Sequence, residues 1–539
     1  MGIQGLARRI EPYSTHFSPD LLQGYSAIID GPALAYYAQK LALEASGTSS
    51  KIPSYAAVAD EAIRWLNSLE CINIKVSIIL FDGALPSAKR AERCSRLEQN
   101  NRRVRQLRTS YPTTACPIPT YLGSNLYAFL APAIKEALMK SAYASRTHVV
   151  PGEADDWCAL HANNESRPII FTTDTDLVLY DYPPETLIVF LHDADLSAGV
   201  KAYSPAEIRT KLQLKSLVPF AYAVRDKPTD SMGDSIRRAQ SVDLETEDYK
   251  IFSLRYTVDP VTLALLSETQ HPSSNLQHLD VRVSELVHQA SNDSAITNVY
   301  LPLLVEDPVL ASAWTMGQDL RNLAYSLLVP RNSVINEYKR RSQGITVQQI
   351  IPDPVSQMQT TAVDFHDQVK TLMTWASSKA VGAEIAWPLF ALSLVLADMN
   401  TPPLLSLAMR VLNGDFDNTW TFVHLTARVQ AALYSIRILA QVLGVWLAIP
   451  EKSESQLYAC LLGLHEHMKD FPSISDTFPI LGQKANVLAQ HDKLGELIGE
   501  IYSSAGVEVP DESTSSRKKK KQAREAERKK KKAEHRRNQ

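Results

Sequence analysis

Hydrophobic positions in the first 220 residues form short runs separated by longer stretches with helical spacing. The short runs are rich in β-branched and aromatic residues and predict strands at residues 25–29, 76–81, 168–172 and 186–191. Apolar residues three and four positions apart predict helices at residues 32–45, 55–68, 88–107, 126–142 and 153–162. Strands that alternate with helices indicate an α/β fold, a mostly parallel sheet with helices on both faces.

The pattern changes after residue 224. Residues 225–248 are rich in Asp, Ser, Pro and Thr, which is typical of a loop or linker, and a strand-like run follows at 249–258. Helical periodicity then dominates to about residue 504. We therefore expect an α/β domain over 1–224, a linker over 225–248, a mainly α-helical domain over 249–510 and a tail over 511–539.

The longest apolar stretch of the chain lies in the expected helical domain. Residues 431–447 are apolar on nearly every side, which predicts a buried helix. Arg437 and Gln441 interrupt this stretch, so we expect no membrane span and no membrane partner.

The small net charge of −3 conceals a division of the chain into an acidic body and a basic tail. From Arg517 to the end there are 13 Lys or Arg and 3 Asp or Glu, a net charge of +10, and the rest of the chain carries a net charge of −13. The tail has no apolar residue larger than Ala, so we expect it to be disordered. Its lysine runs predict nuclear localisation through an import receptor, or nonspecific binding of nucleic acid; a solubilising tail in a cytoplasmic protein is the alternative.

Carboxylates stand at the ends of three predicted strands and in the first turn of one predicted helix. They are Asp30, Asp82, Asp174 and Asp176 after the strands, and Glu153, Asp155 and Asp156 in the helix turn. Parallel strands open at their carboxyl ends on one crevice, where we expect these side chains to meet. Crowded carboxylates cannot all stay ionised without cations, and Mg²⁺ or Mn²⁺ prefer oxygen ligands. The pattern therefore predicts a site for two such ions, which serve to hydrolyse phosphodiester bonds.

Each acid alone also has a structural interpretation. An Asp at a strand end commonly caps the following helix or turn, and acids in the first turn of a helix are stabilised by its dipole. The coincidence of several strand ends favours the metal site. Within the helix turn, Asp156 lies three residues after Glu153 and shares its face in an ideal helix, so geometry alone favours Asp156 over Asp155.

A basic helix is predicted directly after the Asp82 strand. Residues 89–108 contain eight Lys or Arg against Glu92 and Glu98, with Lys89, Arg93 and Arg96 on one face. Such a face can hold the phosphates of a nucleic acid beside the metal site. A solvated surface helix is the alternative.

Five motifs, taken together and in order, resemble the flap endonuclease/XPG superfamily, which has a PIN-like fold. They are GIQGL at 2–6, IIDGPALAYY at 28–37, ILFDG at 79–83, PGEADDWCA at 151–159 and TTDTDLVLYD at 172–181. In the second half, LDVRVSELVHQ at 279–289 and the segment 299–328 resemble the asteroid branch of the superfamily, particularly its fungal members. The resemblance identifies 1–224 as the nuclease domain with the family's N and I regions, and 249–510 as an asteroid-type domain.

The resemblance also implies roles for single residues. The family's metal-binding acids match Asp30, Asp82, Glu153, Asp155, Asp174 and Asp176, which selects Asp155 over Asp156. Lys89 and Arg90 match the catalytic basic residues that contact the scissile phosphate. The expected nucleic-acid-binding residues are Gly2, Arg93, Arg96 and Arg103.

The chain departs from the family in two respects. Where flap endonucleases carry a Gly-x-Asp-Tyr motif with a further metal ligand, the sequence reads FAYAVRDKPTDS at 220–231, so Asp226 and Asp230 are the candidates for that ligand. No segment with the glycine-rich hairpin that grips duplex DNA in the family follows.

Two functions follow from the sequence. The first is a nuclease that depends on two Mg²⁺ or Mn²⁺ ions and cuts branched or overhanging DNA, or RNA. The second is a catalytically degenerate interaction or signalling protein, because the asteroid branch is linked to growth-factor receptor signalling. All six acids are present, which favours the nuclease.

Overall fold

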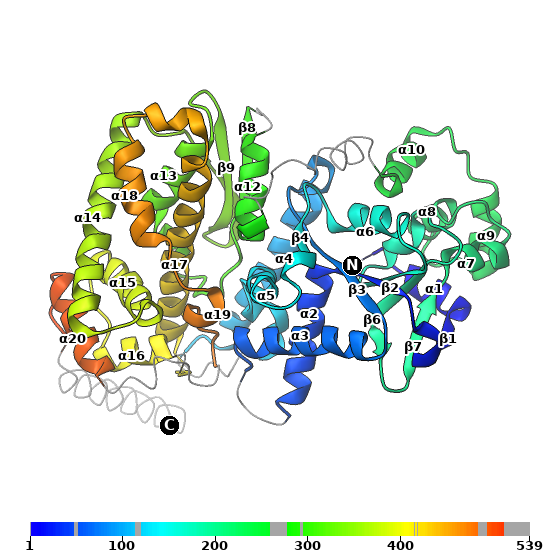
Figure 1. Cartoon of the computed structure of the whole chain (residues 1–539), viewed down its shortest axis with the longest axis horizontal. Helices are drawn as coiled ribbons and strands as arrows, with labels where there is room; N and C mark the ends of the chain where they lie inside the picture. Colours follow the sequence, from blue (N-terminus) through cyan, green and yellow to red (C-terminus); the bar gives the residue numbers. More distant parts are fainter. Residues whose placement is uncertain are drawn as a thin grey trace, which may run out of the picture.

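The computed structural model of the chain describes residues 2–47, 52–113, 120–258, 277–291, 295–413, 415–417, 419–482 and 493–510. An α/β region and a mainly helical region lie side by side (Figure 1). The predicted α/β fold class with a helical second half is therefore confirmed. The basic tail predicted over 511–539 lies outside the described residues.

The sheet of the α/β region has the strand order β1-β7-β6-β5-β2-β3-β4. The strands are β1 (Thr15–Phe17), β2 (Ser26–Asp30), β3 (Lys75–Phe81), β4 (Thr147–Val149), β5 (Pro168–Thr172), β6 (Leu187–Asp195) and β7 (Gly199–Tyr203). Strands β6, β5, β2, β3 and β4 are parallel to one another, whereas β7 pairs antiparallel with both β6 and β1. The parallel strands β2, β3 and β5 therefore end at the same edge of the sheet.

Two hydrophobic clusters cover the two faces of this sheet. Successive side chains of a strand point to opposite faces, so Ile29 belongs to one cluster and Ile28 to the other. Helices α2 (Gly31–Ala45), α3 (Tyr55–Cys71) and α5 (Leu130–Met139) pack on the first face, and α6 (Ala154–Ala162), α7 (Pro205–Leu212) and α8 (Val218–Asp226) on the second. Buried β-branched and leucine side chains on both faces explain why the strands read as continuous apolar runs.

Residues 225–258 contradict two predictions. The expected loop at 225–248 contains helix α9 (Met232–Gln240), whose first turn is capped by the Ser231 side chain. The expected strand at 249–258 is wrong, because it forms α10 (Glu247–Ser253) and a 3₁₀ turn. Tyr249, Phe252 and Tyr256 are buried at helical spacing, and the exposed apolar side chains of Ile251 and Leu254 between them obscured this pattern.

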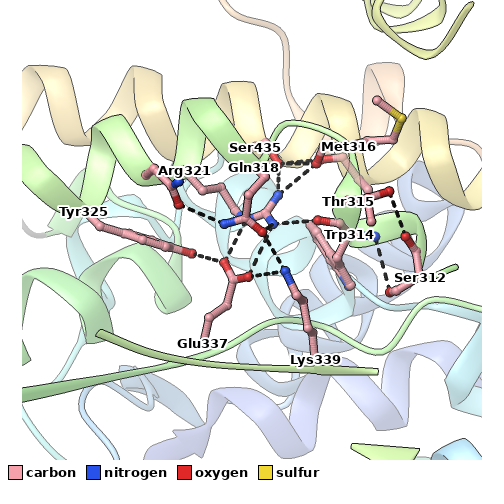
Figure 2. Close-up of polar contacts among 12 residues, drawn as sticks. Ser312, Trp314, Thr315, Met316, Gln318, Arg321, Tyr325, Glu337, Lys339 and Ser435 are labelled. Carbon is pink, nitrogen blue, oxygen red and sulfur yellow. Dashed lines mark hydrogen bonds and ion pairs between the residues drawn. The ribbon is translucent and has the colours of Figure 1, made fainter. Parts of the chain in front are cut away.

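The helical region contains a small sheet that the sequence did not predict. Its strands are β8 (Ile296–Tyr300), β9 (Val334–Arg341) and β10 (Gly344–Ile350), in the order β10-β9-β8. Strand β9 carries charges that are buried. Figure 2 shows Glu337 of β9 bonded to Arg321 and Tyr325 of α13 (Gln318–Leu328) and to Lys339. The distance between Arg321 Nε and Glu337 Oε2 is 2.9 Å. Ion pairing allows these charged residues to be buried. The strand therefore lacks the apolar pattern from which a buried strand is predicted.

The remaining helices pack on α17 (Trp420–Leu447) or on the helices that contact it. They are α12 (Val281–Ser291), α14 (Val355–Lys379), α15 (Ala383–Ala397), α16 (Leu405–Asn413), α18 (Tyr458–Met468), α19 (Ile474–Thr477) and α20 (Leu494–Ser504). By length and composition α17 could cross a membrane, but 78% of its apolar window is buried inside the molecule. Arg437 of α17 forms ion pairs with Asp280 and with Glu136 of α5, so α17 is also joined to the α/β region.

The two regions share one hydrophobic cluster. Phe129 before α5 packs against Tyr434 of α17 and Phe478, with ring centres 4.6 and 4.9 Å apart. The helix α4 (Arg90–Ser110) of the first region also contacts β10 of the second. Residues of the helical region therefore help to position α4.

Candidate active site

A solvent-open pocket lies where β2, β3 and β5 end. It has a volume of about 870 Å³ including its mouth. Its lining includes the acids Asp30, Asp82, Glu153, Asp155 and Asp174, and the basic residues Lys89, Arg93 and Arg96. The acids come from the strand ends and the start of α6, and the basic residues come from α4 and the turn before it. The structure thus brings together five of the six predicted acids and faces them with a basic wall.

The strand-end acids also cap helices. The Asp30 carboxylate accepts hydrogen bonds from Ala33 N, at 3.1 Å, and from the Thr172 hydroxyl, at 2.6 Å. Asp82 accepts from Ala154 N at 2.9 Å and so caps α6. The same acids can therefore cap helices and line the pocket, because each capping hydrogen bond fixes a carboxylate at the edge of the pocket.

The two acids of α6 point in different directions. Asp155 lines the pocket, whereas Asp156 accepts a hydrogen bond from the Tyr180 hydroxyl at 2.7 Å. The helix-face argument for Asp156 is wrong, because Glu153 has extended backbone angles and precedes the helix that begins at Ala154. The spacing rule of an ideal helix does not apply across that boundary.

Burial, and to a lesser extent crowding, raises the pKa of two carboxyl groups in the pocket. Burial raises the pKa of Asp30 to about 7 and that of Asp155 well above its usual range, and the charges of Asp82 and Asp174 add to both shifts. The Thr172 hydrogen bond opposes the shift of Asp30. The ionised forms are thus unfavourable in this pocket unless a cation compensates them.

Part of this compensation comes from Lys89, which forms an ion pair with Glu153. Burial raises the pKa of Glu153 and Lys89 lowers it; the effect of burial is the larger, so the net shift is upward. Burial lowers the pKa of Lys89, but Glu153, with Asp155 and Asp174, outweighs this effect, so the net shift is upward. Lys89 is therefore a cation held among the acids.

The donor chemistry of the pocket suits hard divalent cations, since carboxylate oxygens are their preferred ligands. Within the part of the chain that the structure describes, no three His, Cys, Asp or Glu side chains already form an arrangement that could hold an ion. The carboxylates are near one another, but their side chains would have to turn to share an ion.

The basic wall is attached to the helical region. Arg93 donates to Glu285 of α12 at 2.7 Å, and its guanidinium lies 4.9 Å from the centre of the Tyr300 ring of β8. Arg96 lines the pocket and pairs with Glu92. Two predicted basic residues are not brought to the pocket: Arg90 is not among its lining residues, and Arg103 is exposed further along α4.

The N-terminal segment lies against the loop after β5. A Cβ atom on Gly2 would overlap Thr175 Oγ1 and Asp176 Oδ1, so a larger residue here would displace these side chains. Ile3 N donates to Asp176 at 2.7 Å, and the Tyr256 hydroxyl donates to it at 3.0 Å. Burial and the neighbouring Asp174 raise the pKa of Asp176 to about 6. Asp176 therefore lies beside the pocket but does not line it.

Sequence reasoning missed Tyr36, which lines the pocket and is 54% exposed. Its position six residues after the capping Asp30 on α2 was the available signal. Neither of the candidates for the missing family ligand lines the pocket: Asp226 is exposed, and Asp230 pairs with Arg238 at 2.9 Å.

A family model described as "XPG domain containing" matches residues 126–351. This match supports the predicted relation to the flap endonuclease/XPG superfamily, and it includes Glu153, Asp155, Asp174, Asp176 and the small sheet. No curated protein matches the chain.

Solved nuclease structures have weak overall similarity to the chain. Human GEN1 in complex with Holliday junction DNA is 13% identical, with 54% of this chain and 78% of that chain covered and a TM-score of 0.31. The catalytic core of Rad2 in complex with a DNA substrate is 15% identical, with 50% and 77% covered and a TM-score of 0.28.

Proposed function

We propose that the chain is a metal-dependent, structure-specific nuclease that hydrolyses phosphodiester bonds in branched or overhanging DNA. The observation that carries this proposal is the pocket in which acids from three strand ends and from α6 face the basic wall of α4. The family-model match over 126–351 supports it. The preference for DNA, and an asteroid-type identity, rest on the motif resemblance.

The acids have the role of metal ligands in this proposal. The proposed set for two Mg²⁺ or Mn²⁺ ions is Asp30, Asp82, Glu153, Asp155, Asp174 and Asp176. When bound, two such ions supply an activated water and stabilise the leaving oxygen of a phosphodiester. The Thr172 hydroxyl, which joins Asp30 on β2 to β5, holds that carboxylate toward the pocket. Glu153 becomes free to act as a ligand when Lys89 turns away from it.

The basic wall has the role of holding the substrate. Lys89, next to Glu153, and Arg96 line the pocket, where they would pair with the phosphate at the cleaved bond and with its neighbour. The Tyr36 ring at the mouth of the pocket offers a surface on which a base can stack. Arg90 and Arg103, which lie off the pocket, are assigned to more distant phosphates.

The ion pair between Lys89 and Glu153 also favours a second candidate function. It partly neutralises the acids without any ion, as expected of a catalytically degenerate protein that serves as an interaction or signalling partner. The two candidates differ in whether the pocket takes up divalent cations.

Thermal unfolding in a titration of Mg²⁺ and Mn²⁺ tests this difference. A ligand that binds only the folded state raises its stability by mass action, so the nuclease predicts a melting temperature that rises with the ion. Asp155→Asn should remove most of the rise, whereas Asp181→Asn, at a side chain that is 91% exposed, should retain it. No rise in the wild type, or an equal rise in both variants, would favour the degenerate protein.

A further inference from the structure

A second hollow lies on the C-terminal half of α4, outside the acidic pocket. It has a volume of about 940 Å³ including its open mouth. It is lined by Arg102, Arg105, Gln106, Arg108, Thr109, Pro308, Val309 and Gln343. We call it the α4 groove. One wall is α4, and the other is formed by the helical region.

The α4 groove carries an excess of positive charge. The Arg102 side chain is 74% exposed, and Arg102 and Arg105 share one carboxylate, Glu98, at 3.8 and 3.9 Å. Glu98 also accepts a hydrogen bond from Ile345 N at 3.0 Å. Arg108 is neutralised by Asp307 at 2.9 Å. The body of the chain is acidic and repels a polyanion, whereas the local surplus of positive charge attracts it. A polyanion would therefore be concentrated at the groove.

The groove is not an extension of the acidic pocket. Lys89 and Arg93 lie on one face of the helical path, whereas Arg102, Arg105 and Thr109 lie on a face rotated from it by roughly 170°. Arg93 and Arg105 are about 18 Å apart along the helix axis. A strand that engages both surfaces therefore has to pass over α4.

Part of the rim of the groove is apolar. Val309 is 68% exposed, and Leu310 beside it is also exposed. Tyr111, partly exposed, follows groove residue Thr109 at the end of α4. A positive groove with apolar and aromatic neighbours suits a strand whose bases are unpaired, because these bases have faces that can stack. Duplex DNA would present only its phosphates to such a rim.

The walls of the groove are held in place by bonds between the two regions. Asn101 of α4 donates to the Gln343 carbonyl at 3.0 Å, and Gln343 in turn donates to the Pro308 carbonyl at 3.2 Å. Trp420 donates to the Tyr111 carbonyl at 2.7 Å. The groove is thus formed before any ligand binds, which lowers the entropic cost of binding.

We propose that the α4 groove binds single-stranded nucleic acid through its phosphates, as a second contact for a strand whose other part lies in the acidic pocket. The choice of nucleic acid as the ligand rests on the nuclease function proposed above. Arg102 and Arg105 are the residues that pair with phosphate, and neither lines the acidic pocket.

Binding of a fluorescently labelled single-stranded oligonucleotide in EDTA tests the groove. The full chain, an Arg102→Gln/Arg105→Gln variant and a control Arg64→Gln/Arg237→Gln variant are compared in a salt titration, with the basic tail present in all three. Arg64 and Arg237 are exposed arginines outside both hollows. Losing two phosphate contacts should weaken binding and reduce the slope of log K against log salt by about 1.4.

The groove assignment is overturned if the groove variant binds like the control, or if an acidic peptide competes as well as the oligonucleotide. A blunt duplex that loses equal affinity in the groove variant would overturn the single-strand assignment. Because no ion is present, the result is independent of cleavage. If wild type binds the oligonucleotide through the groove but cuts no substrate, the nuclease proposal is refuted and the groove proposal stands. If wild type cuts substrate but the groove variant binds the oligonucleotide normally, the groove proposal is refuted and the nuclease proposal stands.

Discussion

Arg93 on α4 and Glu285 on α12 form an ion pair of 2.7 Å that joins the basic wall of the acidic pocket to the helical region. The Glu285 side chain is buried, and the Arg93 guanidinium also lies over the Tyr300 ring. Residues far apart in the sequence thus orient one side chain of the pocket. The helical region is therefore part of the site's architecture.

This pair predicts a measurable coupling. Glu285→Gln should lower the free energy of unfolding by about 1–2 kcal/mol, because a partly buried charged hydrogen bond is lost. In a double-mutant cycle with Arg93→Gln, the interaction energy should be about 1 kcal/mol. Urea unfolding of the four proteins measures it. Additive single effects would mean that the two side chains act independently.

The close packing of Gly2 predicts sensitivity to a single methyl group. Gly2→Ala should displace the segment that contacts Asp176, and a misplacement of this size at a catalytic site costs about 10²-fold in rate. Gly152→Ala is the matched control, because a Cβ there meets no atom within 4 Å. Comparable rates for both variants would show that the N-terminal segment does not support the site.

The raised pKa of Asp30 predicts a dependence of stability on pH in EDTA. The folded-state pKa of about 7 exceeds the unfolded value near 3.9, so the folded protein binds more protons between these values. Stability contributed by this group is therefore present at low pH and lost as the pH rises through 7. Asp30→Asn retains the acceptor for Ala33 N but cannot ionise, so it should be more stable than wild type at pH 7 without metal. Urea unfolding midpoints of wild type and variant across pH 4–8 measure this difference in stability. A wild type that is more stable than the variant at pH 7 would contradict the prediction.

The basic tail predicts the location of the protein. Deletion of the residues after Ser516 removes 13 Lys or Arg and should shift a fluorescent fusion out of the nucleus. Microscopy of the full-length and truncated fusions in the same cells tests this. A truncated protein that remains nuclear would leave the tail a solubilising or nucleic-acid-binding role.

The edge of the sheet was predictable from sequence because each strand there is a buried apolar run that ends in an acid. Residues 168–172 were predicted with the bounds of β5, and Asp30 and Asp82 follow from neighbouring runs. The choice between Asp155 and Asp156 was not predictable from periodicity, since the exact start of α6 decides it. Strand β9 was hidden because its charged residues find partners only in the folded chain, as Glu337 does in Arg321. The pairing of Arg93 with Glu285 could not be predicted, because the two residues are 192 positions apart and no local sequence pattern connects them.

The most direct test of the nuclease is cleavage of labelled 5′-flap, 3′-overhang and single-stranded DNA in Mg²⁺ or Mn²⁺. Wild type is compared with Asp82→Ala and Asp174→Ala, at two strand ends of the pocket, and with Asp181→Ala as an exposed control. We expect metal-dependent cutting by wild type and control, reduced by at least about 10³-fold in both pocket variants because a metal ligand is lost. Wild type that cuts none of these substrates, or pocket variants that cut as fast as wild type, would contradict this expectation.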